Sequence, residues 1–305
     1  MSFTSVVKNE VSKLNILEIE KIAELSAIIH NSEISLEHIK ISTENASVAR
    51  RIYSLIKELF NEYAKITVRK GYNYNKSLIY ILEINNHVEK VLDGLAIKDN
   101  NNILDIPKTY IIDDMDTMRA YMRGLFLING SINDPKKSRY HLEFLVDNEA
   151  YANFMMNNLN EFYLNSKVIK RDNKYMIYIK EAEKIGDFLR IINATSALLY
   201  YEDIRIYRDH KNMTNRLNNM EQANVDKIIE TGMKQVEEIE KIKSIGGLDL
   251  LDEKVKEVAI YRLKYPEVSL VELSEIITME TGNKITKSGL YHRLKKISQL
   301  AEKIK

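Results

Sequence analysis

Residues Arg119–Ser131 read RAYMRGLFLINGS, a run of small and apolar residues at helical spacing that ends in Asn-Gly-Ser. A second run of the same character, IAELSAIIHNS, covers Ile22–Ser32 and ends in Asn-Ser. Asn31 and Asn129 occupy the same place in the two runs. Self-similarity of this kind indicates that one structural unit occurs twice along the chain.

The segments that follow the two runs correspond in type and order. After the first run we expect a strand, a helix, two strands and a helix, at Ile34–Ile41, Ala46–Tyr63, Ile66–Lys70, Leu78–Ile84 and Val88–Leu95. After the second run the same order is expected at Tyr140–Val146, Glu149–Tyr163, Lys167–Arg171, Tyr175–Ile179 and Ala182–Ile192. The sequence therefore predicts a duplicated α+β domain over residues 1–211, with halves at about 1–97 and 116–211.

Two other segments are predicted to connect parts of the chain. Lys98–Asp116 is polar, rich in Asn and Asp, and contains Pro107, which suits either a linker or a surface insertion within one domain. Thr214–Lys243 has a long helical pattern that Gly232 weakens, and the pair Gly246-Gly247 ends it. We therefore expect a helical linker over residues 212–247.

Residues 248–305 are predicted to form a small, all-helical domain. Asp252–Lys264 places its apolar residues on one stripe, namely Val255, Val258, Ala259 and Leu263. Ser269 with Glu272 forms a capping box that begins the next helix, and a turn over Thr278–Lys284 contains Gly282. The last helix is capped by Thr286 or Ser288 and directs Leu290, Leu294, Ile297 and Ala301 inward. The pattern is that of a helix-turn-helix.

The composition of the 305 residues excludes several classes of protein. The chain has no Cys, so it can form no disulfide framework, thiolate nucleophile or Cys-ligated metal site. It has no 18-residue apolar run, and its first residues lack the apolar stretch of a signal peptide, so we expect a cytoplasmic protein that does not associate with a membrane. With 45 basic and 44 acidic residues the net charge is +1, which by itself argues against a nucleic-acid partner.

The distribution of charge along the chain, in contrast, favours a nucleic-acid partner. Across residues 284–305 seven residues are basic and only Glu302 is acidic, a strong positive excess on the last helix. The candidate DNA-binding residues are Lys284, Thr286, Lys287, Ser288, Tyr291, His292, Arg293, Lys295 and Lys296. The first turn of such a helix would meet base edges, and lysines further along would pair with phosphates. A solvated terminal helix is the alternative, but the charge coincides with a helix-turn-helix.

Further basic residues lie outside the last helix. The predicted hairpin tips carry Arg69, Lys70, Tyr72, Tyr74 and Lys76 in one half, and Lys170, Arg171, Lys174 and Tyr175 in the other. Basic residues interleaved with tyrosines suit an auxiliary nucleic-acid surface, although solvated turn lysines explain them equally well. Arg208, Lys211 and Arg216 at the start of the long helix suit interdomain contact or neutralisation of a phosphate backbone.

Four separated stretches resemble the WhiA family of bacterial DNA-binding proteins: RAYMRGLFLINGSIN (Arg119–Asn133), YHLEF (Tyr140–Phe144), RDHKNMTNRLNNMEQAN (Arg208–Asn224) and TKSGLYHRLKKI (Thr286–Ile297). The resemblance covers nearly the whole chain. It implies a duplicated LAGLIDADG homing-endonuclease fold, followed by a helix-turn-helix similar to one in sigma factors. It also implies a transcriptional regulator of cell division, chromosome segregation and, depending on the host, sporulation. The turn over Thr278–Lys284 is longer than is usual in the family.

The same resemblance argues against catalysis. In LAGLIDADG nucleases the penultimate acidic residue of each motif holds the metal ions, and alignment puts Asn31 and Asn129 at those positions. A neutral amide lacks the charge needed to hold divalent cations. His30 is adjacent, but the other five histidines give no ligand spacing. We therefore expect no enzyme, no metal and no cofactor. Small residues on the two helices, Ser26, Ala27 and Gly124, would allow these helices to approach closely.

The main prediction is thus a nucleoid-associated regulator whose partner is double-stranded DNA at promoters or other chromosomal sites. One alternative is a protein-interaction scaffold that docks a sigma factor or a division protein. Another is an active homing endonuclease, against which the two asparagines argue. The operator sequence, the sign of regulation, the oligomeric state and any small effector are left open by the sequence.

Overall fold

The computed structural model describes residues 1–71, 78–100, 102–137 and 139–304. Tyr72, Tyr74 and Lys76, expected at a hairpin tip, lie outside the described residues. Contacts divide the chain into two compact units, Met1–Arg208 and Asp209–Lys305, which we call the N-terminal and C-terminal units. No helix in the described ranges combines the length and the apolar character needed to cross a membrane.

The N-terminal unit repeats one arrangement of helices and strands. The first copy comprises α2 (Glu18–His30), β1 (Glu33–Ile34), β2 (Ile39–Thr43), α3 (Ala46–Phe60), β3 (Lys65–Lys70), β4 (Leu78–Ile84) and α4 (Val88–Gly94). The second comprises α5 (Met115–Asn129), β7 (Gly130–Ile132), β8 (Leu142–Val146), α6 (Glu149–Glu161), β9 (Lys167–Arg171), β10 (Lys174–Ile179) and α7 (Ala182–Ile191). Each copy forms an antiparallel four-stranded sheet, in the orders β1-β2-β4-β3 and β7-β8-β10-β9. The predicted duplication and α+β class are confirmed.

Each copy has one strand more than the sequence indicated. The single strand expected over Ile34–Ile41 is wrong, because a turn closed by Ser35 N–H and His38 C=O (2.8 Å) separates β1 from β2. In the second copy β7 follows α5 directly. Strands of two or three residues are too short to produce a recognisable alternation of polar and apolar side chains.

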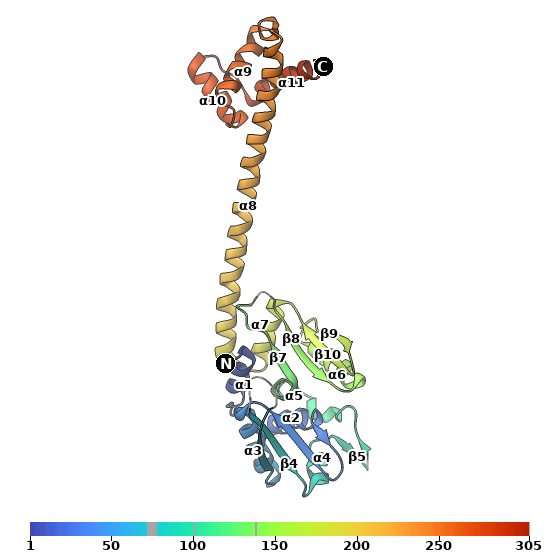
Figure 1. The fold of residues 1–305 in the computed structure, drawn as a ribbon. Helices are drawn as coiled ribbons and strands as arrows, with labels where there is room; N and C mark the ends of the chain where they lie inside the picture. Colours follow the sequence, from blue (N-terminus) through green and yellow to red (C-terminus); the bar gives the residue numbers. More distant parts are fainter. Residues whose placement is uncertain (72–77, 101, 138, 305) are drawn as a thin grey trace. The chain divides into compact units, whose positions relative to one another are not determined.

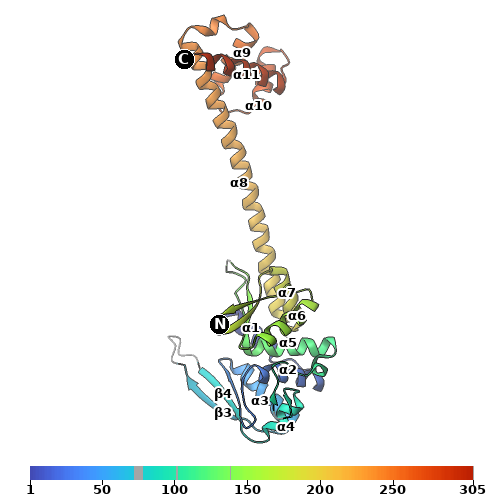
Figure 2. The ribbon, with the colours of Figure 1, turned by 90° about the vertical axis from the view of Figure 1, so that its right-hand side faces the viewer.

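The helices α2 and α5 pack against each other at the centre of the N-terminal unit (Figures 1 and 2). Gly124 of α5 makes this possible, because a Cβ there would lie 2.2 Å from the Glu24 carbonyl oxygen and 2.9 Å from the Ala27 Cβ. The predicted roles of Gly124 and Ala27 agree with these distances. Ser26 acts differently: it is buried, and its hydroxyl donates to the Leu95 carbonyl at 2.8 Å.

A buried ionic cluster lies beside this helix contact. The fully buried Glu24 carboxylate accepts Arg123 Nε at 2.6 Å and Arg51 Nε at 2.8 Å. Arg123 is also fully buried, and both of its terminal nitrogens lack a hydrogen-bond partner. One carboxylate therefore compensates two guanidinium groups inside an otherwise apolar core.

The segment between the copies folds onto the N-terminal unit. It contains β5 (Lys98–Asp99), β6 (Asn102–Ile103) and the 3₁₀ helix η1 (Thr109–Ile112), and it buries Pro107 and Ile111. Of the two interpretations of Lys98–Asp116, this packing favours an insertion within one domain. The polar composition did not indicate this packing, because the segment is held by a few buried side chains and by backbone hydrogen bonds from Leu104 to Ile97 (2.8 Å) and from Lys108 to Ala96 (3.0 Å).

The helix α1 (Phe3–Val11) ties the N-terminus to the start of the long helix α8 (Thr195–Ser244). The Glu10 carboxylate accepts the backbone N–H groups of Ser196 (2.6 Å) and Ala197 (2.9 Å), so it caps α8 and complements the helix dipole. On its other side α1 joins β7, since Thr4 Oγ1 exchanges hydrogen bonds with Ile132 O and N. The long helix begins well before the predicted Thr214, because its first turns, including Ala197 and Tyr201, are buried in this unit.

The C-terminal unit comprises the remainder of α8, the 3₁₀ helix η2 (Gly247–Leu250), α9 (Glu253–Lys264), α10 (Leu270–Thr281) and α11 (Lys287–Lys303). Its apolar core is built from all four α-helices, and Ile239 and Ile242 are the buried contributions of α8. The predicted stripe of α9 packs on this core, with Val255, Val258 and Ala259 buried and Leu263 partly buried. Arg262 is buried as well, because its guanidinium binds the carbonyls of Tyr265 and Val268 beyond the end of the helix.

Candidate nucleic-acid interface

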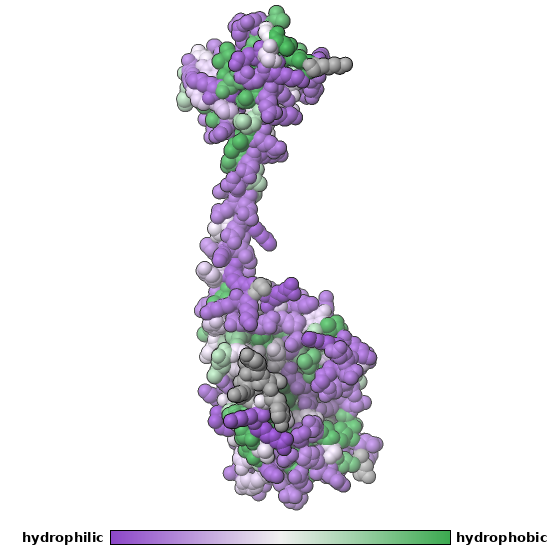
Figure 3. Space-filling view, in the orientation of Figure 1, coloured by the Kyte–Doolittle hydropathy of each residue, from purple (hydrophilic) through white to green (hydrophobic). Residues whose placement is uncertain are grey.

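Helix α11 presents one polar and one apolar face. Thr286 caps the helix by accepting Gly289 N–H at 3.2 Å, which decides between the two expected caps. Leu290, Leu294, Ile297 and Ala301 are buried as predicted. Eight of the nine candidate residues are exposed: Lys284, Thr286, Lys287, Ser288, Tyr291, His292, Lys295 and Lys296. Figure 3 shows hydrophilic side chains over much of the visible surface of this unit.

Arg293, the ninth candidate, does not belong to the outward face. It is half-buried, and its Nη1 donates to the Lys254 carbonyl of α9 at 3.4 Å. On a helix with about 100° per residue, position 293 is turned from position 292 toward the packed side. Arg293 therefore differs from the other eight candidates in its exposure, and its role in DNA binding stays a prediction.

The turn that orients α11 is shorter than the sequence suggested. Residues Thr278–Thr281 are helical, and α10 ends at Gly282, which adopts the left-handed conformation with φ +74°. The Thr278 hydroxyl then accepts Ile285 N–H at 3.3 Å, which holds the chain as it enters α11. The expectation that the turn begins at Thr278 is wrong, because the glycine cap lets α10 continue to Thr281.

A polar cluster joins the C-terminal end of α9 to α10. The Glu280 carboxylate accepts Lys264 Nζ at 2.9 Å and the Tyr265 hydroxyl at 2.9 Å. These contacts lower the pKa of Glu280, first through the hydrogen bond from Lys264, and the same hydrogen bond raises the pKa of Lys264. The cluster is solvent-exposed, so it sets geometry more than stability.

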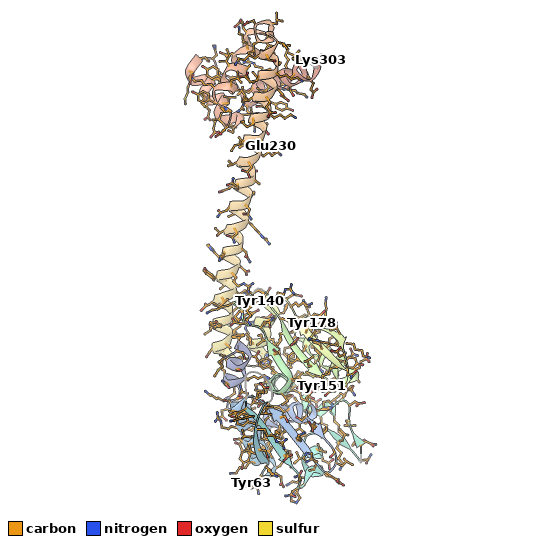
Figure 4. The ribbon with its side chains drawn as sticks, viewed as in Figure 1. Tyr63, Tyr140, Tyr151, Tyr178, Glu230 and Lys303 are labelled. Carbon is orange, nitrogen blue, oxygen red and sulfur yellow. The ribbon has the colours of Figure 1, made fainter. Side chains whose placement is uncertain are left out.

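Asn31 and Asn129, which the resemblance aligns with the acidic positions of nucleases, form a pair of amides. Asn129 Nδ2 donates to Asn31 Oδ1 at 3.3 Å, and Asn31 Nδ2 donates to the Ala27 carbonyl and the Tyr151 hydroxyl, each at 2.8 Å. Tyr151, labelled in Figure 4, donates onward to the Tyr121 hydroxyl at 3.1 Å. Burial is the main cause that raises the pKa of both tyrosines. This network of neutral side chains links the C-terminal ends of α2 and α5 to α6.

His30 lies against the same network. Its ring centroid is 4.8 Å from that of Tyr151. Burial lowers the pKa of His30 to about 4, against weaker opposing contributions from the backbone of Leu104 and Asp105. In the described ranges no three His, Asp or Glu side chains gather as metal ligands would. The side chain is a neutral packing element at physiological pH.

The predicted auxiliary residues on the sheets fall on two different faces. Side chains alternate along a strand, and residues directly paired across strands share a face. Arg69 pairs with Ile79 on β4, and the Arg171 guanidinium lies 4.0 Å from the Met176 sulfur, which places both arginines on the faces directed away from the apolar core. Lys70 and Lys170 take the opposite parity. Arg69 and Arg171 therefore lie on the sheet faces directed away from the apolar core, and Lys70 and Lys170 lie on the opposite faces.

Arg208, Lys211 and Arg216 also have different environments. The Arg208 guanidinium lies 4.5 Å from the ring centroid of Tyr140 and donates to the carbonyls of Pro135 and Lys137 at 2.6 and 2.5 Å. It therefore holds α8 to Pro135, Lys137 and Tyr140 within the N-terminal unit, and this is not a contact between the two units. Lys211 and Arg216 are exposed on α8.

Sequence reasoning missed two basic residues near the start of α11. Lys227 of α8 and Arg262 of α9 line one groove together with Lys287. The periodicity of α8 indicated only a linker, and Arg262 lies beside the apolar stripe of α9, where a basic residue suggests a solvated position. The only available signal was Gly232, whose cost to a helix interior implies a close neighbour.

Three family models match the chain. They are the WhiA N-terminal LAGLIDADG-like domain at residues 18–98, the WhiA LAGLIDADG-like domain at residues 118–211 and the WhiA C-terminal HTH domain at residues 214–301. Proteins named "Probable cell division protein WhiA" from Enterococcus faecalis and Staphylococcus aureus are 42% and 43% identical to it. Both alignments cover 100% of this chain, and they cover 99% and 98% of the relatives.

A solved structure agrees with these matches. The crystal structure of full-length WhiA from Thermatoga maritima is 26% identical, with a TM-score of 0.59, and the comparison covers 100% of this chain and 99% of that one. The expected pair of LAGLIDADG-like domains followed by a helix-turn-helix domain is confirmed.

Proposed function

The chain belongs to the WhiA family, and we propose that it is a non-catalytic regulator that binds double-stranded DNA through α11. The observation that carries this proposal is the outward face of α11, where Tyr291, Lys295 and Lys296 are exposed above a continuous apolar stripe. A helix of this kind enters the major groove, and its charges replace counterions on the phosphates.

The roles within the interface follow from position on the helix. Lys284, Thr286, Lys287 and Ser288 lie at the N-terminal end, which reaches base edges in helix-turn-helix proteins. Tyr291, His292, Lys295 and Lys296 continue along the exposed face and suit phosphate and sugar contacts. Arg293 supports the interface from behind by holding α11 to α9.

The absence of catalysis is part of the proposal and rests on the amides of Asn31 and Asn129. Each contributes no negative charge, and their hydrogen bonds already engage each other and Tyr151. Phosphodiester cleavage on this fold requires oxygen ligands that bind divalent cations strongly, which carboxylates provide and amides do not. The LAGLIDADG-like region then serves as a scaffold, with Arg69 and Arg171 as candidate auxiliary contacts to DNA.

The cellular role follows from the family. Relatives are named as cell division proteins, so we propose that the genes this chain regulates act in cell division and chromosome segregation, and in sporulation where the host sporulates. Binding to DNA would place the protein at the nucleoid. We also propose the division into a domain at 1–211, a helical linker at 212–247 and a DNA-binding domain at 248–305.

The proposal is tested by DNA-binding measurements on the full chain. Lys295→Ala combined with Lys296→Ala should weaken binding to any duplex and lower the salt slope by about 0.9 for each phosphate that is no longer neutralised. Lys234→Ala with Lys241→Ala removes the same charge from exposed positions on α8 and serves as the matched control. Equal binding by both double variants and the unmodified chain would refute the assignment of α11.

A further inference from the structure

A groove with a volume of about 580 Å³ lies within the C-terminal unit, between α8, the turn from α9 to α10, and the first residue of α11. Three of its eleven lining residues are basic, Lys227, Arg262 and Lys287, and none is acidic. The chain as a whole has nearly equal numbers of basic and acidic residues. An open groove with only positive charge attracts anions.

Gly232 allows the walls of the groove to meet. A Cβ at this position would lie 2.0 Å from the Pro266 carbonyl oxygen, so any larger residue would push α8 away from the turn. Glycine in a helix interior is less favourable than alanine, so its presence here is consistent with this close approach. The close approach that it permits holds Lys227 of α8 beside the first turn of α10.

Arg262 places a buried positive charge at the floor of the groove. Its side chain is 1% exposed, and its Nη1 donates to the carbonyls of Tyr265, Pro266 and Val268 at 3.2, 3.3 and 2.8 Å. Its Nε–H has no acceptor, and no carboxylate of the described residues forms an ion pair with it. A buried cation without a counter-ion is unfavourable, so an anion above it would be stabilised.

The N-terminus of α10 adds donors to the same groove. Ser269 caps this helix, and Leu270 and Val271 of its first turn line the groove. Backbone N–H groups in a first turn have no partner within the helix, and the helix dipole is positive there. The carboxylate of the first turn, Glu272, binds Ser269 N–H at 2.8 Å, and neither it nor Glu267 before the cap lines the groove.

We propose that this groove binds one phosphate of the DNA backbone, with Lys227 and Lys287 at its rim and Arg262 beneath. This inference rests on the proposed function, because Lys287 is the first residue of the recognition helix. We favour a DNA phosphate over a free phosphorylated compound for a geometric reason. In a helix-turn-helix the second helix lies in the major groove of DNA, and the first helix crosses the DNA backbone beside it. The long helix α8 thereby becomes part of the DNA-binding surface.

The test compares Lys227→Ala with Lys234→Ala in the full chain. Both lysines are exposed on α8, but Lys234 does not line the groove, and alanine favours the helix at both sites. Binding to a fluorescent duplex of random sequence is measured by anisotropy between about 50 and 200 mM salt. The salt slope is the change in the logarithm of the binding constant with the logarithm of the salt concentration, and Lys227→Ala should lower its magnitude by about 0.9. Between about 50 and 200 mM salt the unmodified chain should therefore lose about 3.5-fold more affinity than Lys227→Ala. Its ranking of different sequences should not change.

The outcomes separate this inference from the proposed function. If the unmodified chain binds duplex DNA and both variants keep its salt slope, the groove holds no backbone phosphate and the inference is overturned. If the unmodified chain binds no duplex, the proposed function itself fails. A second arm titrates inorganic phosphate at constant ionic strength: loss of phosphate binding in Lys227→Ala, with an unchanged DNA slope, would assign the groove to a free phosphorylated compound and overturn the DNA assignment.

Discussion

The side-chain amide of Asn129 donates a hydrogen bond to the amide oxygen of Asn31 over 3.3 Å, joining the ends of the two central helices. The Asn31 amide in turn reaches Tyr151, whose hydroxyl bonds that of Tyr121. Four neutral side chains thus form a chain of hydrogen bonds at the junction of the two halves. These hydrogen bonds join the two LAGLIDADG-like domains at the ends of α2 and α5.

Replacing the two amides with carboxylates should make stability depend on pH. In Asn31→Asp with Asn129→Asp, two carboxylates would face each other, and repulsion would raise the pKa of one above its unfolded value of about 3.9. When the pKa of a carboxyl is higher in the folded than in the unfolded chain, the free energy of unfolding is highest below the unfolded-state pKa. It falls as the pH rises through the folded-state pKa. Urea unfolding should show this double variant losing on the order of 2 kcal/mol between about pH 4 and 7, relative to the unmodified chain. Parallel pH profiles would contradict the described pairing.

His30 should contribute stability that disappears in mild acid. Its pKa in the folded chain is about 4, below the unfolded value of 6.5, so between these values the unfolded chain binds the extra proton. Stability therefore falls as pH drops from 6.5 to about 4, by on the order of 3 kcal/mol for this group. His30→Gln should flatten that part of the profile in urea titrations, and an unaltered slope would show that His30 is solvated.

The buried carboxylate Glu24 should be far more important to stability than an exposed one. Glu24→Gln leaves the guanidinium groups of Arg51 and Arg123 without a counter-ion in the core, at an expected cost of about 3–5 kcal/mol. The control is Glu58→Gln, which removes the exposed pair with Lys21 and should cost less than about 1 kcal/mol. Similar denaturation midpoints for the two variants would mean that the Glu24 cluster is hydrated.

The close contact of α2 and α5 at Gly124 leaves no room for an added methyl group, so Gly124→Ala should lower the free energy of unfolding. Gly124→Ala places a Cβ 2.2 Å from a backbone oxygen of α2, which only a shift of the helix can relieve, and we expect a loss of about 1–3 kcal/mol or more. Gly289→Ala is the comparison, because its nearest neighbour would lie at 3.4 Å and alanine favours a helix. Thermal unfolding should show a lower melting temperature for the first and an unchanged or higher one for the second.

The sequence predicted the repeated order of elements because apolar periodicity and turn residues recur in both halves. It also predicted the apolar face of α11, since Leu290, Leu294, Ile297 and Ala301 follow helical spacing. It could not predict β1 and β7, which are too short to show a pattern, nor the start of α8 at Thr195, which tertiary burial decides.

The candidate interface shows the same limit. Exposure of the lysines on α11 follows from helical spacing, but the turning of Arg293 toward Lys254 depends on α9, a neighbour distant in sequence. Lys227 and Arg262 were missed for a related reason. They converge only because Gly232 admits the Pro266 carbonyl, a contact between helices that no local pattern encodes.

The central claim is that α11 reads DNA and that the amide-paired fold does not cleave it. The test incubates fragments of the host genome with the unmodified chain, or with the double variant Lys295→Ala with Lys296→Ala, at physiological salt and in the presence of Mg²⁺. The fragments that each protein retains are then sequenced. We expect the unmodified chain to retain a small set of intact, promoter-linked fragments that the double variant fails to retain. Equal retention by both proteins, or fragments cut at a fixed position, would contradict it.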